Sequence, residues 1–73
     1  MYRKEKDFVK IANNNLKEEV TASRINILEV GTLNGNITDV LYEDKFKRQY
    51  KVWLKGGTYH KKEIVSRETK KGN

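Results

Sequence analysis

The sequence has no cysteine and no proline, and it holds a single histidine, a single methionine and a single tryptophan. Without cysteine the chain has no disulfide framework and no thiolate metal site, which excludes the disulfide-rich class of small secreted domains. Without proline, glycine and asparagine have to mark the turns. No apolar run approaches the roughly 20 residues that span a bilayer, and the charged N-terminal stretch lacks the apolar segment of a signal peptide. We therefore expect a cytoplasmic protein with no membrane contact.

Positive charge is concentrated in the second half of the chain. Residues 1–44 carry six Lys or Arg and eight Asp or Glu, whereas residues 45–73 carry ten and two, so a half of net charge +8 follows one of −2. A basic surface of this kind favours a polyanionic partner, and the alternative is a solvated basic surface with no partner. With 73 residues we expect a single small domain over 1–65 and a flexible basic tail over 66–73.

The N-terminal segment is predicted to be helical over about 3–20. Its apolar residues lie close to one face of a 3.6-residue period, and they are Phe8, Ile11, Ala12, Leu16 and Val20. The run of three asparagines at 13–15 disfavours a helix, so the helix could instead break there and leave a shorter helix and a turn.

From about residue 24 to 65 the pattern is that of four or five short strands. Asn34-Gly35 and Gly56-Gly57 are typical of tight hairpin turns, because both central positions of a type I′ turn need positive φ. The segment around 25–42 does not alternate strictly, which indicates a β-bulge. The predicted fold class is therefore α+β: an N-terminal helix followed by an antiparallel meander. The helix covers one face of this meander, or the meander curls into a small barrel.

The stretch QYKVWLKGG, residues 49–57, alternates cleanly. Tyr50, Val52 and Leu54 are expected to face the core, and Lys51, Trp53 and Lys55 to face the opposite side. The lone tryptophan thus stands between two lysines. It is either an exposed platform on which a base stacks, or a residue buried beneath the helix or in a dimer interface with lysine stems around it.

Residues 30–65 resemble a small SH3-like β-barrel of the KOW or Tudor kind. The resemblance rests on Gly35-Asn36-Ile37 with Val40, the acidic Glu43-Asp44, the alternating strand 50–54, Gly56-Gly57 and Glu63-Ile64. A helix before such a barrel is also similar to the bacterial Sm-like family Hfq, although residues 59–61 read Tyr-His-Lys where that family has Tyr-Lys-His. The resemblance implies binding to nucleic acid, ribosomal components or other proteins.

The charge and the aromatic residues together predict a nucleic-acid interface. Lysines and arginines would bind phosphates and Trp53 would stack on a base. RNA and single-stranded DNA fit this mechanism best, and duplex DNA bound through its backbone is a further possibility. The expected contact residues are Lys47, Arg48, Lys51, Trp53, Lys55, Tyr59, Lys61 and Lys62. His60 is a further member of the neighbouring strand, expected to be exposed.

The alternative is a protein-interaction or assembly module. Trp53 would then be a hot spot of a homo-oligomer interface or of a docking surface for an acidic partner. The size and style also suit an accessory protein of a phage or mobile element. No residue pattern completes a catalytic, metal or cofactor site: His60 has no second histidine or cysteine near it, and Gly56-Gly57 is not followed by the residues of a phosphate-binding loop. We therefore expect a protein that is not an enzyme.

Overall fold

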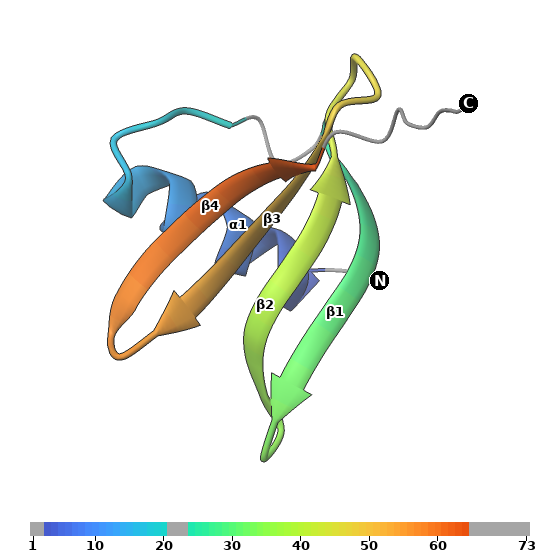
Figure 1. Ribbon diagram of the computed structural model, residues 1–73. Helices are drawn as coiled ribbons and strands as arrows, with labels where there is room; N and C mark the ends of the chain where they lie inside the picture. The colour runs from blue at the N-terminus through green and yellow to red at the C-terminus, as the bar shows by residue number, and fades with distance from the viewer. Residues whose placement is uncertain (1–2, 21–23, 65–73) are drawn as a thin grey trace, which may run out of the picture.

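The computed structural model describes residues 3–20 and 24–64 of the chain, so the predicted tail at 66–73 lies outside the described residues. One helix, α1 (Arg3–Asn15), precedes four strands, β1 (Asn26–Leu33), β2 (Asn36–Glu43), β3 (Gln49–Lys55) and β4 (Thr58–Ile64). The strands form one antiparallel sheet in the order β1-β2-β3-β4. The helix crosses behind this sheet and covers one of its faces (Figure 1). The predicted α+β meander is confirmed.

The helix is shorter than the range 3–20 and ends within the run of asparagines. Lys17 takes a left-handed backbone with φ 62°, Glu18 N donates to Asn13 O at 2.8 Å and Lys17 N donates to Asn14 O at 3.1 Å. These are the two hydrogen bonds of a Schellman motif, which satisfy carbonyls at a helix C-terminus. The break considered at 13–15 is therefore the one that occurs.

Both two-residue turns have the backbone that their sequences predict. Asn34 and Gly35 have φ of 54° and 81°, and Gly56 and Gly57 have φ of 57° and 80°, as a type I′ turn requires. The Gly56-Gly57 turn sets the register of the last hairpin, in which Lys55 pairs with Thr58 and Trp53 with His60. Paired residues point to the same face of the sheet.

The irregular alternation in the first hairpin comes from two bulges. Ile27 pairs with Tyr42 and Glu29 with Leu41, so Leu28 is an extra residue in β1. The second bulge lies in β2, where Thr38 is left between two paired residues. Each bulge reverses the alternation once, and this places Ile37 and Val40 together on the helix side of the sheet. The bulge predicted from the sequence is confirmed.

The hydrophobic core lies between the helix and the sheet. Its buried side chains are Phe8, Val9, Ala12, Ile25, Ile27, Val40, Tyr42 and Val52. Val52 is fully buried and Tyr50 is partly buried against it, as the alternation of β3 predicts, whereas Leu54 at the strand end is 38% exposed. The expectation that Ile11 packs inward is wrong, because it is 47% exposed and Val9 takes the buried position.

The described strands form an open sheet whose edges are β1 and β4. Of the two architectures considered, the structure takes the sheet covered on one face by the helix. The opposite face, here called the outer face, has no element of the described chain over it (Figure 1).

Candidate nucleic-acid interface

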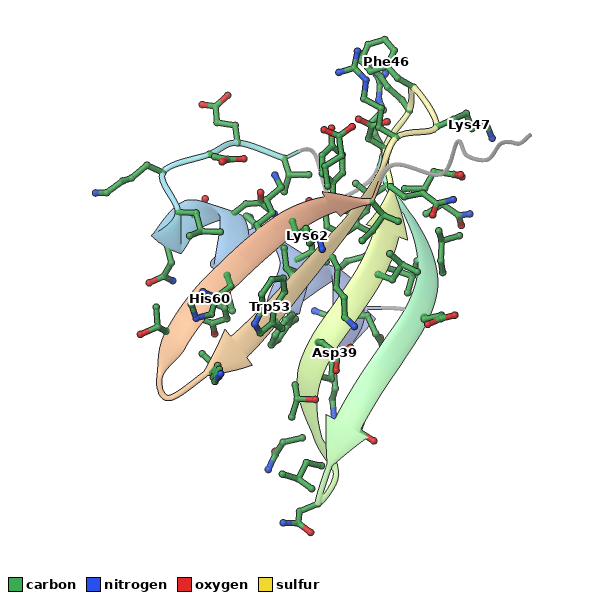
Figure 2. The ribbon with its side chains drawn as sticks, in the orientation of Figure 1. Asp39, Phe46, Lys47, Trp53, His60 and Lys62 are labelled. Carbon is green, nitrogen blue, oxygen red and sulfur yellow. The ribbon has the colours of Figure 1, made fainter. Side chains whose placement is uncertain are left out.

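Trp53 lies on the outer face, away from the helix. Its indole ring stacks on the imidazole of His60, with ring centroids 5.4 Å apart and an angle of 18° between the planes. Figure 2 shows the two side chains side by side on β3 and β4, on the side of the sheet opposite the helix. The alternative in which Trp53 is buried beneath the helix is therefore wrong, whereas an interface with another molecule remains compatible with its position. His60 is half-buried by this contact, not exposed as expected.

Two lysines lie directly opposite each other in the next row of the same face. Lys51 pairs with Lys62 across β3 and β4, and both are exposed. Like charges at directly opposite positions destabilise a sheet. A negative group near the two ammonium groups offsets this repulsion, whether it is a carboxylate of the protein or a phosphate of a ligand. Lys55 adds a third ammonium group to this face, further along β3.

A carboxylate stands beside this pair. Asp39 Oδ2 lies 3.7 Å from Lys51 Nζ, and Asp39 Oδ1 accepts a hydrogen bond of 2.9 Å from Thr38 Oγ1. Asp39 is the register partner of Trp53 on one side and of Gly31 on the other. Its side chain leans over Gly31, where a Cβ atom would collide with the carboxylate. The glycine therefore makes room for the position that Asp39 takes.

These side chains surround a hollow of about 620 Å³ on the outer face. Its lining combines an indole, a carboxylate, three ammonium groups and apolar carbon, from Thr38, Asp39, Lys51, Trp53, Leu54, Lys55, Lys62 and Ile64. The hollow is shallow and largely open to solvent, so it offers a surface rather than an enclosed pocket, and its aromatic wall beside polar groups suits a flat polar ring.

The outer face is not uniformly basic. By register and alternation it carries the carboxylates of Glu29, Asp39 and Glu43 as well as the three lysines of β3 and β4. The positive charge of the chain is instead continued by the turn between β2 and β3, which holds Lys45, Lys47 and Arg48. The electrostatic part of an interface therefore depends on this turn as well as on the face.

The turn at 44–48 is held by side-chain hydrogen bonds and presents an exposed aromatic ring. Asp44 Oδ1 accepts hydrogen bonds from the backbone N–H groups of Phe46 (2.8 Å) and Arg48 (2.9 Å). Phe46 is 64% exposed, and Lys45 Nζ and Arg48 Cζ lie 5.1 Å and 5.5 Å from its ring centroid. Figure 2 shows Phe46 and Lys47 at the tip of the turn, beyond the end of the sheet. Phe46 is therefore a second aromatic side chain with cationic groups close to its ring.

Two predicted contact residues lie on the other face of the sheet. Tyr59 pairs with Leu54, and Lys61 with the fully buried Val52, so both point toward the helix. The Tyr59 ring packs edge-on against Phe8 at 5.6 Å. The expectation that Tyr59 and Lys61 join Trp53 on one surface is therefore wrong. The residues of β4 that do join it are His60 and Lys62.

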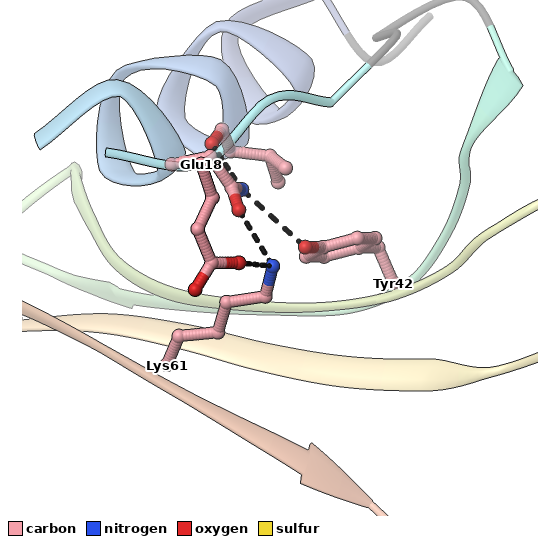
Figure 3. A network of polar contacts seen from close by, with 5 residues as sticks. Glu18, Tyr42 and Lys61 are labelled. Atoms are coloured by element: carbon pink, nitrogen blue, oxygen red, sulfur yellow. Dashed lines mark hydrogen bonds and ion pairs between the residues drawn. The ribbon is translucent and has the colours of Figure 1, made fainter. Parts of the chain in front are cut away.

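Lys61 is instead part of a polar network that joins the helix to the sheet (Figure 3). Its Nζ donates to Asn13 Oδ1 at 2.7 Å and to Glu18 Oε1 at 2.7 Å. The buried Asn13 donates in turn to Val9 O at 2.8 Å and to the Tyr42 hydroxyl at 3.3 Å. Burial by itself lowers the pKa of Lys61, but Glu18 and the Tyr42 oxygen outweigh it, so the pKa is raised above its ordinary value. This lysine stabilises the fold and is not available to a phosphate.

Sequence reasoning missed Asp39 and Phe46 and undervalued His60. The position of His60 was within reach of the sequence, because a two-residue turn at 56–57 pairs residue 53 with residue 60. The position of Asp39 could not be predicted in this way, because the face of the sheet on which it lies depends on a bulge whose position cannot be read from the sequence.

Within the described part of the chain, no three His, Asp or Glu side chains come together as metal ligands do. No helix there is long and apolar enough to cross a bilayer. No protein-family model, curated protein or solved structure matches the chain.

Proposed function

We propose that the protein binds single-stranded nucleic acid on the outer face of its sheet. The observation that carries this proposal is the position of Trp53, which stands on the uncovered face, stacked on His60, beside the lysine pair 51 and 62. Aromatic side chains on open sheets serve as platforms for unpaired bases. The bases of a duplex are already stacked on one another, so a platform of this kind selects single strands over duplex DNA.

Stacking is the main source of affinity on this face. A base stacked on an aromatic side chain contributes about 1–3 kcal/mol. The carboxylates of Glu29, Asp39 and Glu43 reduce the attraction of the face for phosphates, which limits non-specific binding. The cations of the 44–48 turn add phosphate contacts where β3 begins, and Phe46 offers a second ring on which a base can stack.

The salt dependence of binding follows from the number of phosphates neutralised. If Lys51, Lys62 and Lys55 each neutralise one phosphate, log K should fall against log salt with a slope of about −2 for a single strand. Engagement of the turn would make the slope steeper. The proposal rests on the outer face and not on the resemblance of residues 30–65 to small barrels, because the described strands form an open sheet.

The balance of charge on the outer face favours a second candidate, a protein-interaction or homo-oligomer interface. Leu41 and Ile64 lie half-buried on this face among three lysines and three carboxylates. A self-complementary surface of that composition could pair with a second copy or with a protein partner, with Trp53 as its hot spot.

The experiment that tests the proposal is fluorescence anisotropy with a labelled 12-nucleotide RNA, the matching single-stranded DNA and the duplex, each from 25 to 200 mM salt. Trp53→Ala should weaken single-strand binding about 5- to 150-fold, the equivalent of one lost stack, while circular dichroism shows an unchanged fold. Lys62→Met should lower the salt slope by about 0.7. Its matched control is Lys10→Met, the same change at an exposed position on the helix, which should leave the slope unchanged.

Two results would contradict the proposal. One is the absence of binding at 25 mM salt, and the other is equal binding by wild type and a folded Trp53→Ala. Sedimentation of wild type beside Trp53→Ala then tests the second candidate, which requires a dimer that the substitution dissociates.

A further inference from the structure

A single row of residues crosses all four strands of the outer face. Gly31 of β1 pairs with Asp39 of β2, Asp39 with Trp53 of β3, and Trp53 with His60 of β4. Figure 2 shows the labelled members of this row, Asp39, Trp53 and His60, on neighbouring strands. The row therefore places a carboxylate next to the stacking platform, one strand away from it.

The hollow on the β2 side of Trp53 leaves room for one flat ring whose edge is turned toward the Asp39 carboxylate. Neighbouring strands are about 4.8 Å apart, and the imidazole of His60 covers the β4 side of the indole with ring centroids 5.4 Å away. The next position in this stack lies over β2. Asp39 leaves that position open because its side chain leans over Gly31, and the hollow lined by Trp53, Asp39 and Lys51 lies there.

Both oxygens of the Asp39 carboxylate retain acceptor capacity for a ligand, because each carries two lone pairs. Oδ1 accepts from Thr38 Oγ1, whereas Oδ2 accepts no hydrogen bond from the residues at 3–20 and 24–64 and has Lys51 Nζ at 3.7 Å. An ionised carboxylate only accepts hydrogen bonds, and it can accept two parallel ones from adjacent donors. The base beside it must therefore present donors at its edge.

From this arrangement, which rests on the proposed function, we infer that the outer face selects guanine. The Watson–Crick edge of guanine carries N1–H and N2–H side by side, and both are open in a single strand. These two donors match the two oxygens of Asp39 while the guanine ring stacks on Trp53. Adenine and cytosine each present one amino donor beside a ring acceptor that the carboxylate repels, and uracil presents one N–H between two carbonyls.

The selectivity expected is that of one bidentate contact, roughly 5- to 150-fold in affinity. Lys51 and Lys62, in the next row, are placed to neutralise the flanking phosphates. Glu29 lies in that next row as the partner of Leu41, is exposed and faces no aromatic ring in its row. It therefore provides a matched control for a carboxylate that does not read a base.

The test uses the intrinsic fluorescence of Trp53, the single tryptophan of the chain. The probes are heptamers with three uridines on each side of a central guanine, inosine, adenine, cytosine or uracil, made as RNA and as DNA with thymine in place of uracil. We expect the guanine heptamer to bind at least about 5-fold more tightly than the others. Inosine, which lacks the N2 amino group, should fall with the weaker group, and the better of the RNA and DNA series identifies the sugar.

Variants separate this inference from the proposed function. Asp39→Asn should bring all heptamers to nearly equal affinity while binding persists, and Glu29→Gln should leave the guanine preference intact. Equal binding of all heptamers by wild type, with Trp53→Ala still weakening single-strand binding in the anisotropy assay, would overturn the guanine inference and leave the stacking platform standing. Absence of binding to any heptamer at low salt would overturn both.

Discussion

Replacing Lys61 by methionine should destabilise the fold, whereas the same replacement of its neighbour Lys62 should not. The two lysines are adjacent in the sequence but lie on opposite faces of β4, since Lys61 pairs with Val52 and Lys62 with Lys51. The side chain of Lys61 is 17% exposed, and Lys62 is exposed. The pair of variants therefore applies one chemical change to two environments and tests the register on which the candidate interface depends.

The expected cost at Lys61 follows from its two hydrogen bonds. The bond to Asn13 Oδ1, 2.7 Å long, satisfies an acceptor on a fully buried residue, and leaving such a group unpaired costs about 1–3 kcal/mol. The ion pair with Glu18 involves a side chain that is 53% exposed and adds at most about 1 kcal/mol. Methionine fills similar space without the cost of burying an ammonium group, which offsets part of the loss. The net decrease in the free energy of unfolding should be about 1–3 kcal/mol.

Lys62→Met should change the free energy of unfolding by no more than about 0.5 kcal/mol, as surface substitutions usually do. Both variants would be unfolded with urea and monitored by far-UV circular dichroism and by Trp53 fluorescence. For a domain of this size, 1 kcal/mol corresponds to about 4–8 °C in Tm, so the Lys61 variant should melt about 5–20 °C lower. Equal destabilisation by the two variants, or a greater effect at Lys62, would refute the register and with it the composition of the outer face.

Three further predictions concern the fold. Because the pKa of Lys61 is raised above 10.5, its stabilisation is complete below that pH and is lost as pH rises through the folded-state pKa; the difference in urea midpoint between wild type and Lys61→Met should be constant from pH 7 to 9 and shrink by pH 11. Val52→Ala should cost about 2 kcal/mol, since Val52 is fully buried, against almost nothing for Leu33→Ala, which alters a residue 65% exposed; similar urea midpoints for the two would contradict this. Lys17→Gly should raise Tm through its φ of 62°, whereas Lys10→Gly within α1 should lower it by the equivalent of about 1 kcal/mol; a decrease for both would argue against the helix C-cap.

Much of the fold follows from local patterns that the sequence displays. The alternation of 49–55 separates Val52 from Trp53, because strand geometry sends successive side chains to opposite faces whatever the rest of the chain does. The turns at 34–35 and 56–57 are equally local, since few residue pairs accept positive φ at both positions. Counting outward from Gly56-Gly57 would also have paired Trp53 with His60 and Lys51 with Lys62. The same count places Tyr59 and Lys61 on the opposite face from Trp53, although all three residues are close in the sequence.

The end of the helix and the face of the sheet on which Asp39 lies were harder to predict from the sequence. Three consecutive asparagines indicate a break in the helix. The burial of Asn13, however, depends on its contacts with Lys61 and Tyr42, which lie 48 and 29 positions away. The side of Asp39 depends on a bulge at Thr38, because a shift of one residue moves a strand's side chains to the other face. The sequence indicates that a bulge exists but does not place it.

The element types, the two tight turns and the separation of Trp53 from the apolar stripe of its own strand follow from the sequence alone, because each depends on backbone geometry over a few residues. Which face the helix covers is set by tertiary packing, and this leaves Trp53 and His60 partly exposed on the outer face while Lys61 lies on the helix side, in a polar network. That choice depends on how the helix surface fits the sheet and on polar contacts between residues far apart in the chain, such as Asn13 with Lys61. Packing of this kind is a property of the assembled surfaces, and no local segment of the sequence encodes it.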